Sequence, residues 1–165
     1  MVIIFAYILL RFGKWQYSTG AILAMVHDVV IVLGIFAAFH GIMPFNMDID
    51  QAFIAAILTV IGYSINDTVV VFDRIREEIG LDADLGNKEL MIKTINESIN
   101  HTMSRTVMTA TTVFLVVSVL LFFGGDVLRG FSFAMFIGVV FGAYSSIFVA
   151  APIVIDFGTS KKEKK

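Results

Sequence analysis

The chain has 165 residues, of which 58% are hydrophobic and 16% are charged, and its mean hydropathy is +0.87. Soluble domains are only about 45 to 50% apolar and about 25% charged, so the composition excludes an ordinary soluble domain and indicates an all-α, polytopic membrane protein. The net charge of −2 gives no sign of a nucleic-acid partner, and the absence of cysteine excludes disulfides and thiolate metal sites.

Five apolar segments are predicted to be membrane spans. A helix needs about 20 apolar residues to cross the hydrocarbon core; four segments approach this length, whereas the first is about half as long and is interpreted as truncated. Together they predict a membrane domain over residues 1–157 that forms a transmembrane helix bundle. The predicted spans are residues 1–12 (truncated), 20–39, 52–72, 106–123 and 130–155.

The polar segment between the third and fourth spans contains one further predicted helix. Apolar residues recur there at three- and four-residue spacing, which is typical of an amphipathic helix. We expect it over residues 87–105, along the membrane surface or under the bundle. The periodic residues are Met91, Ile92, Ile95, Ile99 and Met103.

The basic residues predict the topology. Eleven of the 12 Lys and Arg residues fall at 11–14, at 74–105 or in the basic tail at 158–165, and only Arg129 lies elsewhere. Cytoplasmic loops are enriched in Lys and Arg, so these three regions are predicted to be cytoplasmic. The N-terminus is then outside, and the simplest interpretation of its half-length span is that an upstream part is missing.

The third and fourth spans carry the candidate functional residues. An Asp near the centre of a bilayer costs about 2.5 to 3.5 kcal/mol, and such an acid is functional by default. We expect Asp67 and Arg105 to form a pair when the acid is ionised and to separate when it is protonated. Both lie on polar stripes that helical spacing predicts to face the bundle interior. The stripes are Thr59, Gly62, Tyr63, Asn66 and Asp67 in the third span, and Arg105, Thr109 and Thr112 in the fourth.

Less specific roles remain open for each of these residues. Asp67 could be a permanently satisfied buried acid, and Arg105 could extend to lipid phosphates, as arginines near an interface commonly do. Asn66 could simply link two helices, since interhelical hydrogen bonds contribute about 0.6 kcal/mol on average. His27 and Asp28 are adjacent and point about 100° apart, so a buried hydrogen-bonding role is favoured over a metal site.

The last span carries a small residue at every fourth position, which predicts a smooth ridge for close helix packing. No phosphate-binding glycine loop, nucleophile elbow, zinc helix or GxGD-type acid pair is present, so neither an enzyme nor a cofactor is expected. The ridge comprises Ala134, Gly138, Gly142, Ser146 and Ala150.

Four motifs resemble a known family. They are GYSINDTVVVFDRIREE at 62–78, VHDVV at 26–30, SINHTMSRTVMT at 98–109 and FGGDVLRGF at 123–131. The chain is similar in these motifs to the SecD/SecF family of protein-export membrane proteins, of the resistance-nodulation-division superfamily. It resembles the SecF branch more closely, because SecD carries a differently placed acid and a Glu-Arg where this chain has Asp73 and Arg74.

The resemblance implies a function and a set of partners. SecF-like proteins have six spans with an extracytoplasmic domain between the first two, so this chain would begin inside the second span. With SecD, beside the SecYEG channel in the cytoplasmic membrane of bacteria or archaea, they would use proton flow to draw a preprotein out. The acid of the Asn-Asp motif and the arginine of the Ser-Arg-Thr motif, here Asp67 and Arg105, would couple the protons.

The mechanistic hypothesis is that Asp67 takes and releases the proton, Asn66 and the threonines orient it through water, and Arg105 adjusts the proton affinity. Two alternatives stay open. One is a scaffold whose small-residue ridge only docks SecD, and the other is a proton-driven subunit for small-molecule efflux.

Overall fold

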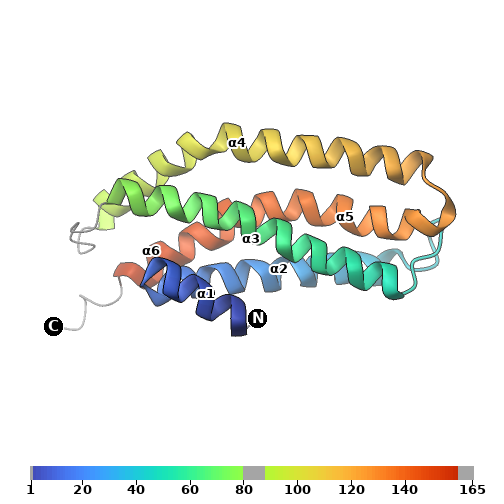
Figure 1. The fold of residues 1–165 in the computed structure, drawn as a ribbon, viewed down its shortest axis with the longest axis horizontal. Coiled ribbons are helices and arrows are strands. Elements are labelled where there is room, and N and C mark those ends of the chain that lie inside the picture. The colour runs from blue at the N-terminus through green and yellow to red at the C-terminus, as the bar shows by residue number, and fades with distance from the viewer. Residues whose placement is uncertain (1, 80–87, 160–165) are drawn as a thin grey trace.

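The computed structural model describes residues 2–79 and 88–159, and every regular element in these ranges is helical, which confirms the all-α prediction. The long helices run side by side as an elongated bundle (Figure 1). The elements are α1 (Val2–Phe12), α2 (Trp15–Phe39), α3 (Gln51–Ile79), α4 (Lys88–Phe123), α5 (Asp126–Ser145), the π-helical segment η1 (Ser146–Ala150) and α6 (Ala151–Thr159).

Four of the described helical stretches are long and apolar enough to cross a membrane, and each contains one of the predicted full-length spans. The helices extend beyond the predicted spans because hydropathy marks only the part that lies in hydrocarbon, whereas the backbone hydrogen bonds continue into polar sequence. The stretches are Trp15–Phe39, Gln51–Ile79, Met91–Phe123 and Asp126–Phe157, with α1 as a shorter apolar helix.

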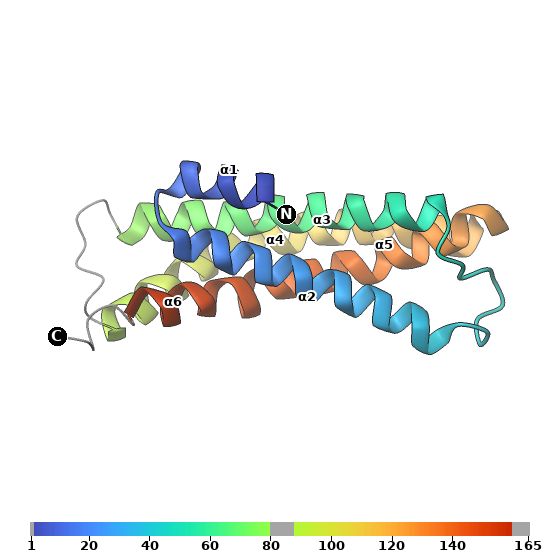
Figure 2. The same cartoon turned by 90° about the horizontal axis from the view of Figure 1, so that it is seen from below.

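The predicted cytoplasmic end has its own core, where α1 folds back onto α2. Gly13 makes the turn with a φ of 68°, a conformation that glycine adopts without the steric penalty of a Cβ. Phe12, Tyr17 and Phe72 then pack together, with ring centroids 5.1 to 6.0 Å apart. Figure 2 shows α1 lying along the outside of the bundle beside this end of α3. The aromatic cluster therefore fixes α1 against α2 and α3.

The amphipathic helix and the fourth span form one continuous helix, α4, rather than two. No glycine or proline interrupts the sequence from 88 to 123, so no residue there would end the helix. Met91 and Ile95, on the predicted apolar face, are 4% and 1% exposed and belong to a buried core cluster, so this part of the face packs against the other helices. In Figure 1 the first part of α4 is inclined to the rest.

Two predicted features fall partly outside the described residues. Asn87, where the amphipathic helix was predicted to begin, lies outside them. The basic tail at 158–165 is described only in its first two residues, which belong to α6. Its four lysines lie outside the described residues.

The small-residue ridge is buried within this chain. A Cβ at Gly138 would overlap the side chain of Val60, and one at Gly142 would lie 3.4 Å from Cβ of Ser64, so both glycines face α3. The carbonyl oxygen of Ala150, at the end of the ridge, approaches Gly20 of α2. The ridge thus seats the last span against α3 and α2. Its five residues, Ala134, Gly138, Gly142, Ser146 and Ala150, are all buried.

Gly138→Ala should destabilise the protein more than Gly142→Ala. The first substitution forces a methyl group into Val60, which is fully buried, whereas the second meets Ser64 at an ordinary contact distance. Overpacking of this kind costs about 1 to 3 kcal/mol. Thermal unfolding in detergent would measure both variants against the parent chain, and equal losses of stability would contradict the packing described.

Candidate functional site

The two predicted proton-coupling residues lie on neighbouring helices. Asp67, on α3, is 4% exposed, and its Oδ2 atom has no hydrogen-bond partner in the described part of the chain. Arg105, on α4, is exposed and lies within electrostatic range of Asp67. The ion pair expected between them is not formed among the described residues, because none of their nitrogen and oxygen atoms come within 4.0 Å.

Tyr63 lies one turn before Asp67 on α3 and completes this site. Its side chain is half-buried and lies near both Asp67 and Thr109. Its hydroxyl oxygen is buried and has no hydrogen-bond partner within 3.5 Å among the described residues. Tyr63 and Asp67 thus each carry a buried oxygen without a partner in that part of the chain, as in sites that exchange protons or bind water.

Most residues of the predicted polar stripes do not face the interior of this chain. On α3, Thr59, Gly62 and Asn66 are exposed, so only Asp67 and part of Tyr63 face inward. Helical spacing shows which residues share a face, but it does not show whether that face meets the same chain or another one. The outward-facing residues form a polar strip along the membrane-spanning part of α3.

The predicted stripe of the fourth span is also exposed in this chain. Thr109 and Thr112 are exposed, and their hydroxyls donate to carbonyl oxygens of their own helix, at 3.0 Å to Arg105 and 2.8 Å to Thr109. The buried positions of α4 are instead Thr102 and Thr106. We call the exposed set the polar face. It comprises Thr59, Gly62 and Asn66 of α3 with Arg105, Thr109 and Thr112 of α4.

A second acid, Asp28 on α2, is fully buried and fully hydrogen-bonded. Its Oδ2 accepts hydrogen bonds from Ser64 of α3 at 2.6 Å and from Ser145 of α5 at 2.8 Å. Its Oδ1 lies 3.1 Å from Nδ1 of His27, whose side chain is 31% exposed. The predicted hydrogen-bonding role is confirmed for Asp28. One turn away, the hydroxyls of Thr68 and Ser146 are 2.9 Å apart.

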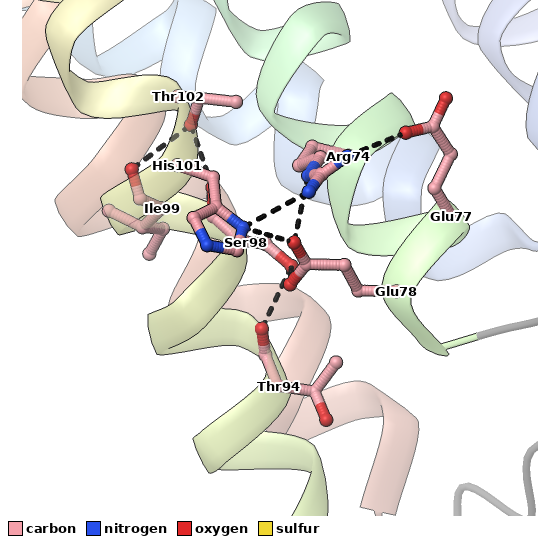
Figure 3. Close-up of polar contacts among 8 residues, drawn as sticks. All are labelled: Arg74, Glu77, Glu78, Thr94, Ser98, Ile99, His101 and Thr102. Carbon is pink, nitrogen blue, oxygen red and sulfur yellow. Dashed lines mark hydrogen bonds and ion pairs between the residues drawn. The ribbon is translucent and has the colours of Figure 1, made fainter.

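A polar cluster at the predicted cytoplasmic end joins α3 to α4, and sequence reasoning missed it (Figure 3). Glu78 is its centre: Ser98 donates to its Oε2 at 2.6 Å, and Nδ1 of His101 lies 2.6 Å from its Oε1. Arg74 pairs with the same carboxylate at 2.8 Å and reaches His101 at 3.1 Å. The available signal was Arg74 and Glu78 at four-residue spacing, facing Ser98 and His101 on the amphipathic helix.

No group of three or more potential metal ligands occurs among the residues that the structure describes. A carboxyl with an unpartnered oxygen, near the hydroxyl of Tyr63 and the guanidinium of Arg105, can bind and release a proton, and the guanidinium can stabilise the ionised form.

The fold and this arrangement define a multi-pass α-helical membrane protein with two acids buried among its spans. Residues 1–160 match the family described as "Protein export membrane protein SecD/SecF, C-terminal". The chain therefore belongs to the SecD/SecF family, which confirms the resemblance seen in the sequence.

Two curated relatives and one solved structure illustrate the similarity. "Protein translocase subunit SecF" of Rhodothermus marinus is 54% identical over 156 residues, which are 94% of this chain and 49% of the relative. The subunit of the same name from Cereibacter sphaeroides is 46% identical over 163 residues, 96% of this chain and 47% of the relative. A crystal structure of SecDF in its super-membrane-facing form superposes with a TM-score of 0.85 at 41% identity, covering 98% of this chain and 21% of the SecDF chain.

The chain spans about half the length of the curated relatives it matches. Both of those relatives are named translocase subunits, in line with the prediction that the chain is not an enzyme.

Glu78→Ala should loosen the cytoplasmic part of α4. The substitution removes the acceptor shared by Ser98, His101 and Arg74, and a local loss of about 1 to 2 kcal/mol changes an opening equilibrium by a factor of about 5 to 30. Hydrogen exchange over residues 91–105 would measure this effect.

The matched control is Glu97→Ala on the same helix. Glu97 is exposed and pairs only weakly with Lys93, at 3.9 Å, so its loss should leave exchange unchanged. Equal protection in the Glu78 and Glu97 variants would show that the cluster does not hold α4.

Proposed function

We propose that the chain is the membrane part of a SecF-type subunit that works with SecD and the SecYEG channel in the cytoplasmic membrane. In this role it couples proton flow to the export of preproteins. The proposal is supported by membership of a family of protein export membrane proteins and by similarity to SecDF along nearly the whole chain. The observation that carries the proton coupling is Asp67, a buried intramembrane acid with an unpartnered carboxyl oxygen.

The proposed mechanism begins with the energetics of Asp67. An ionised carboxylate is unfavourable in the hydrocarbon region unless hydrogen bonds or an opposite charge stabilise it. In the structure Oδ2 has no such hydrogen bond, and Arg105 is near but does not form a direct ion pair. Proton uptake removes the charge, whereas proton release favours movement of the flexible Arg105 side chain toward the acid. The proton thereby changes the contact between α3 and α4.

The polar face gives the proposed position of SecD. Only 11% of the apolar window of α4 is buried in this chain, against 50% for the last span, so α4 has most of its surface free. Lipid cannot form hydrogen bonds with Asn66 or stabilise Arg105 at depth, whereas a membrane helix of a partner can do both. We place SecD against the polar face, so that the proton site lies between the two subunits.

The scaffold alternative loses its main support. It required the small-residue ridge to be free for SecD, but Gly138 and Gly142 already face Val60 and Ser64 of α3. A substitution such as Gly142→Leu would damage this chain directly and would not report on docking alone. The polar face is therefore the better surface on which to test association.

Asp67→Asn, introduced into the full-length protein that carries this chain, should abolish the proton dependence of export. Asn keeps the size of the side chain but cannot exchange a proton at this position. Export of a preprotein into inverted membrane vesicles, with and without a proton gradient, would measure the effect. Asp48→Asn, at an exposed loop position, is the control and should behave like the parent protein. Unchanged proton-dependent export in the Asp67 variant would refute the mechanism.

Thr112→Trp should weaken association with SecD. The large side chain would stand on the polar face, where a partner helix must approach closely. Co-purification of SecD from detergent extracts is the measurement, and a fall of about tenfold corresponds to about 1.4 kcal/mol. Val140→Trp, at an exposed position of α5, is the control. If the Val140 variant loses SecD and the Thr112 variant keeps it, the partner lies on the other side of the bundle.

A further inference from the structure

The two intramembrane acids have opposite surroundings, and this difference indicates different roles. Asp67 has a carboxyl oxygen with no partner, whereas both carboxyl oxygens of Asp28 have polar neighbours within 3.1 Å. The carboxyl oxygens of Asp28 are thus occupied by contacts to neighbouring side chains, whereas one oxygen of Asp67 is left without a partner among the described residues. Asp28 is therefore suited to holding helices together, and Asp67 to titrating.

The hydrogen bonds of Asp28 join three membrane helices. The acid lies on α2, and its two serine donors come from α3 and α5. Gly138, one turn before Gly142 on α5, contributes to this arrangement, because a Cβ there would overlap Val60 and hold α5 away from α3. Ser64 and Ser145 can then both reach one carboxyl oxygen.

The same contacts fix the rotation of α3 around Asp67. Ser64 lies three residues before Asp67, and Thr68, which contacts Ser146 at 2.9 Å, comes directly after it. Residues three and four apart share a helix face, so Ser64 and Thr68 form two polar contacts on one side of α3. A helix held at both positions cannot rotate without breaking a buried hydrogen bond.

We propose that Asp28 is a positioning residue for Asp67. Its carboxylate holds Ser64 and Ser145, and with the contact between Thr68 and Ser146 it sets the rotation of α3 that keeps Asp67 buried beside the polar face. Asp28 does not carry the transported proton. This inference rests on the proposed function only in taking Asp67 as the titrating group.

Carbodiimide labelling tests the inference without measuring export. Hydrophobic carbodiimides react with protonated carboxyl groups in membranes, and mass spectrometry would give the labelling rate at each acid in membrane vesicles. In the parent chain we expect faster labelling at Asp67 than at Asp28, because Asp28 is 0% exposed and its carboxyl oxygens are held by Ser64, Ser145 and His27. Equally rapid labelling of Asp28 would overturn the proposal.

Ser64→Ala is the mildest variant that breaks the link between α2 and α3. It should change the labelling rate of Asp67 by about twofold to tenfold, the range that corresponds to one lost hydrogen bond. Ser132→Ala is the matched control: Ser132 is equally buried, on α5, but its hydroxyl has no hydrogen-bond partner in the described residues. A rate that is unchanged in Ser64→Ala, or changed equally in both variants, would overturn the inference.

Asp28→Asn separates the positioning role from proton transport. The side-chain carbonyl oxygen of Asn can still accept hydrogen bonds from Ser64 and Ser145, so we expect Asp67 to label nearly as in the parent chain and proton-dependent export to persist. In the Asp28→Ala variant, by contrast, the labelling rate of Asp67 should differ from that in the parent chain. Loss of proton dependence in Asp28→Asn with normal labelling of Asp67 would show that Asp28 itself carries the proton.

The two hypotheses fail independently. If Asp67→Asn keeps proton-dependent export, the proposed function is wrong, yet the effect of Ser64→Ala on Asp67 labelling would still establish the positioning role. If Ser64→Ala leaves that labelling unchanged, the positioning role is wrong and the proposed function is unaffected.

Discussion

The packing of the bundle depends on hydrogen bonds to the acidic side chains among its spans. Water is scarce in the hydrocarbon region, so the other helices must supply these hydrogen bonds. Asp28 of α2 accepts hydrogen bonds from α3 and α5, and these two helices approach each other closely at Gly138 and Gly142. At Asp67, by contrast, one carboxyl oxygen has no hydrogen-bond partner among the residues that the structure describes. Asp28 thus holds helices together, while Asp67 remains able to react. A buried carboxylate without a partner is costly, and a proton or a nearby cation would remove that cost.

The helices form two groups, which differ in how much of their surface is packed within the chain. α2, α3 and the last span share the buried polar contacts and the close glycine packing, so they form the fixed part of the bundle. α4 has few buried residues in its apolar window and is joined to α3 at the predicted cytoplasmic end by the cluster around Glu78 (Figure 3). The proposed proton site lies between the fixed helices and α4, where a change of charge can alter their contact.

The sequence predicts the number of long spans, the all-α fold and the importance of Asp67, because the cost of an acid in hydrocarbon is visible without a structure. It does not predict which way the stripes of Asn66 and Thr109 face, because helical periodicity shows only which residues share a face and not what that face contacts. Nor does hydropathy show that residues 88–123 form one helix. The cluster of Glu78 was missed because its charges were interpreted only as the end of a span.

The continuity of α4 has a mechanical consequence. A helix of 36 residues is about 54 Å long, whereas the hydrocarbon core is about 30 Å thick, so α4 reaches well beyond the bilayer as one element. It contains no glycine or proline at which a displacement could be absorbed. The first part of α4 is inclined to the rest (Figure 1), so a tilt near Arg105 would be carried by the stretch that follows and would produce its largest displacement at Phe123.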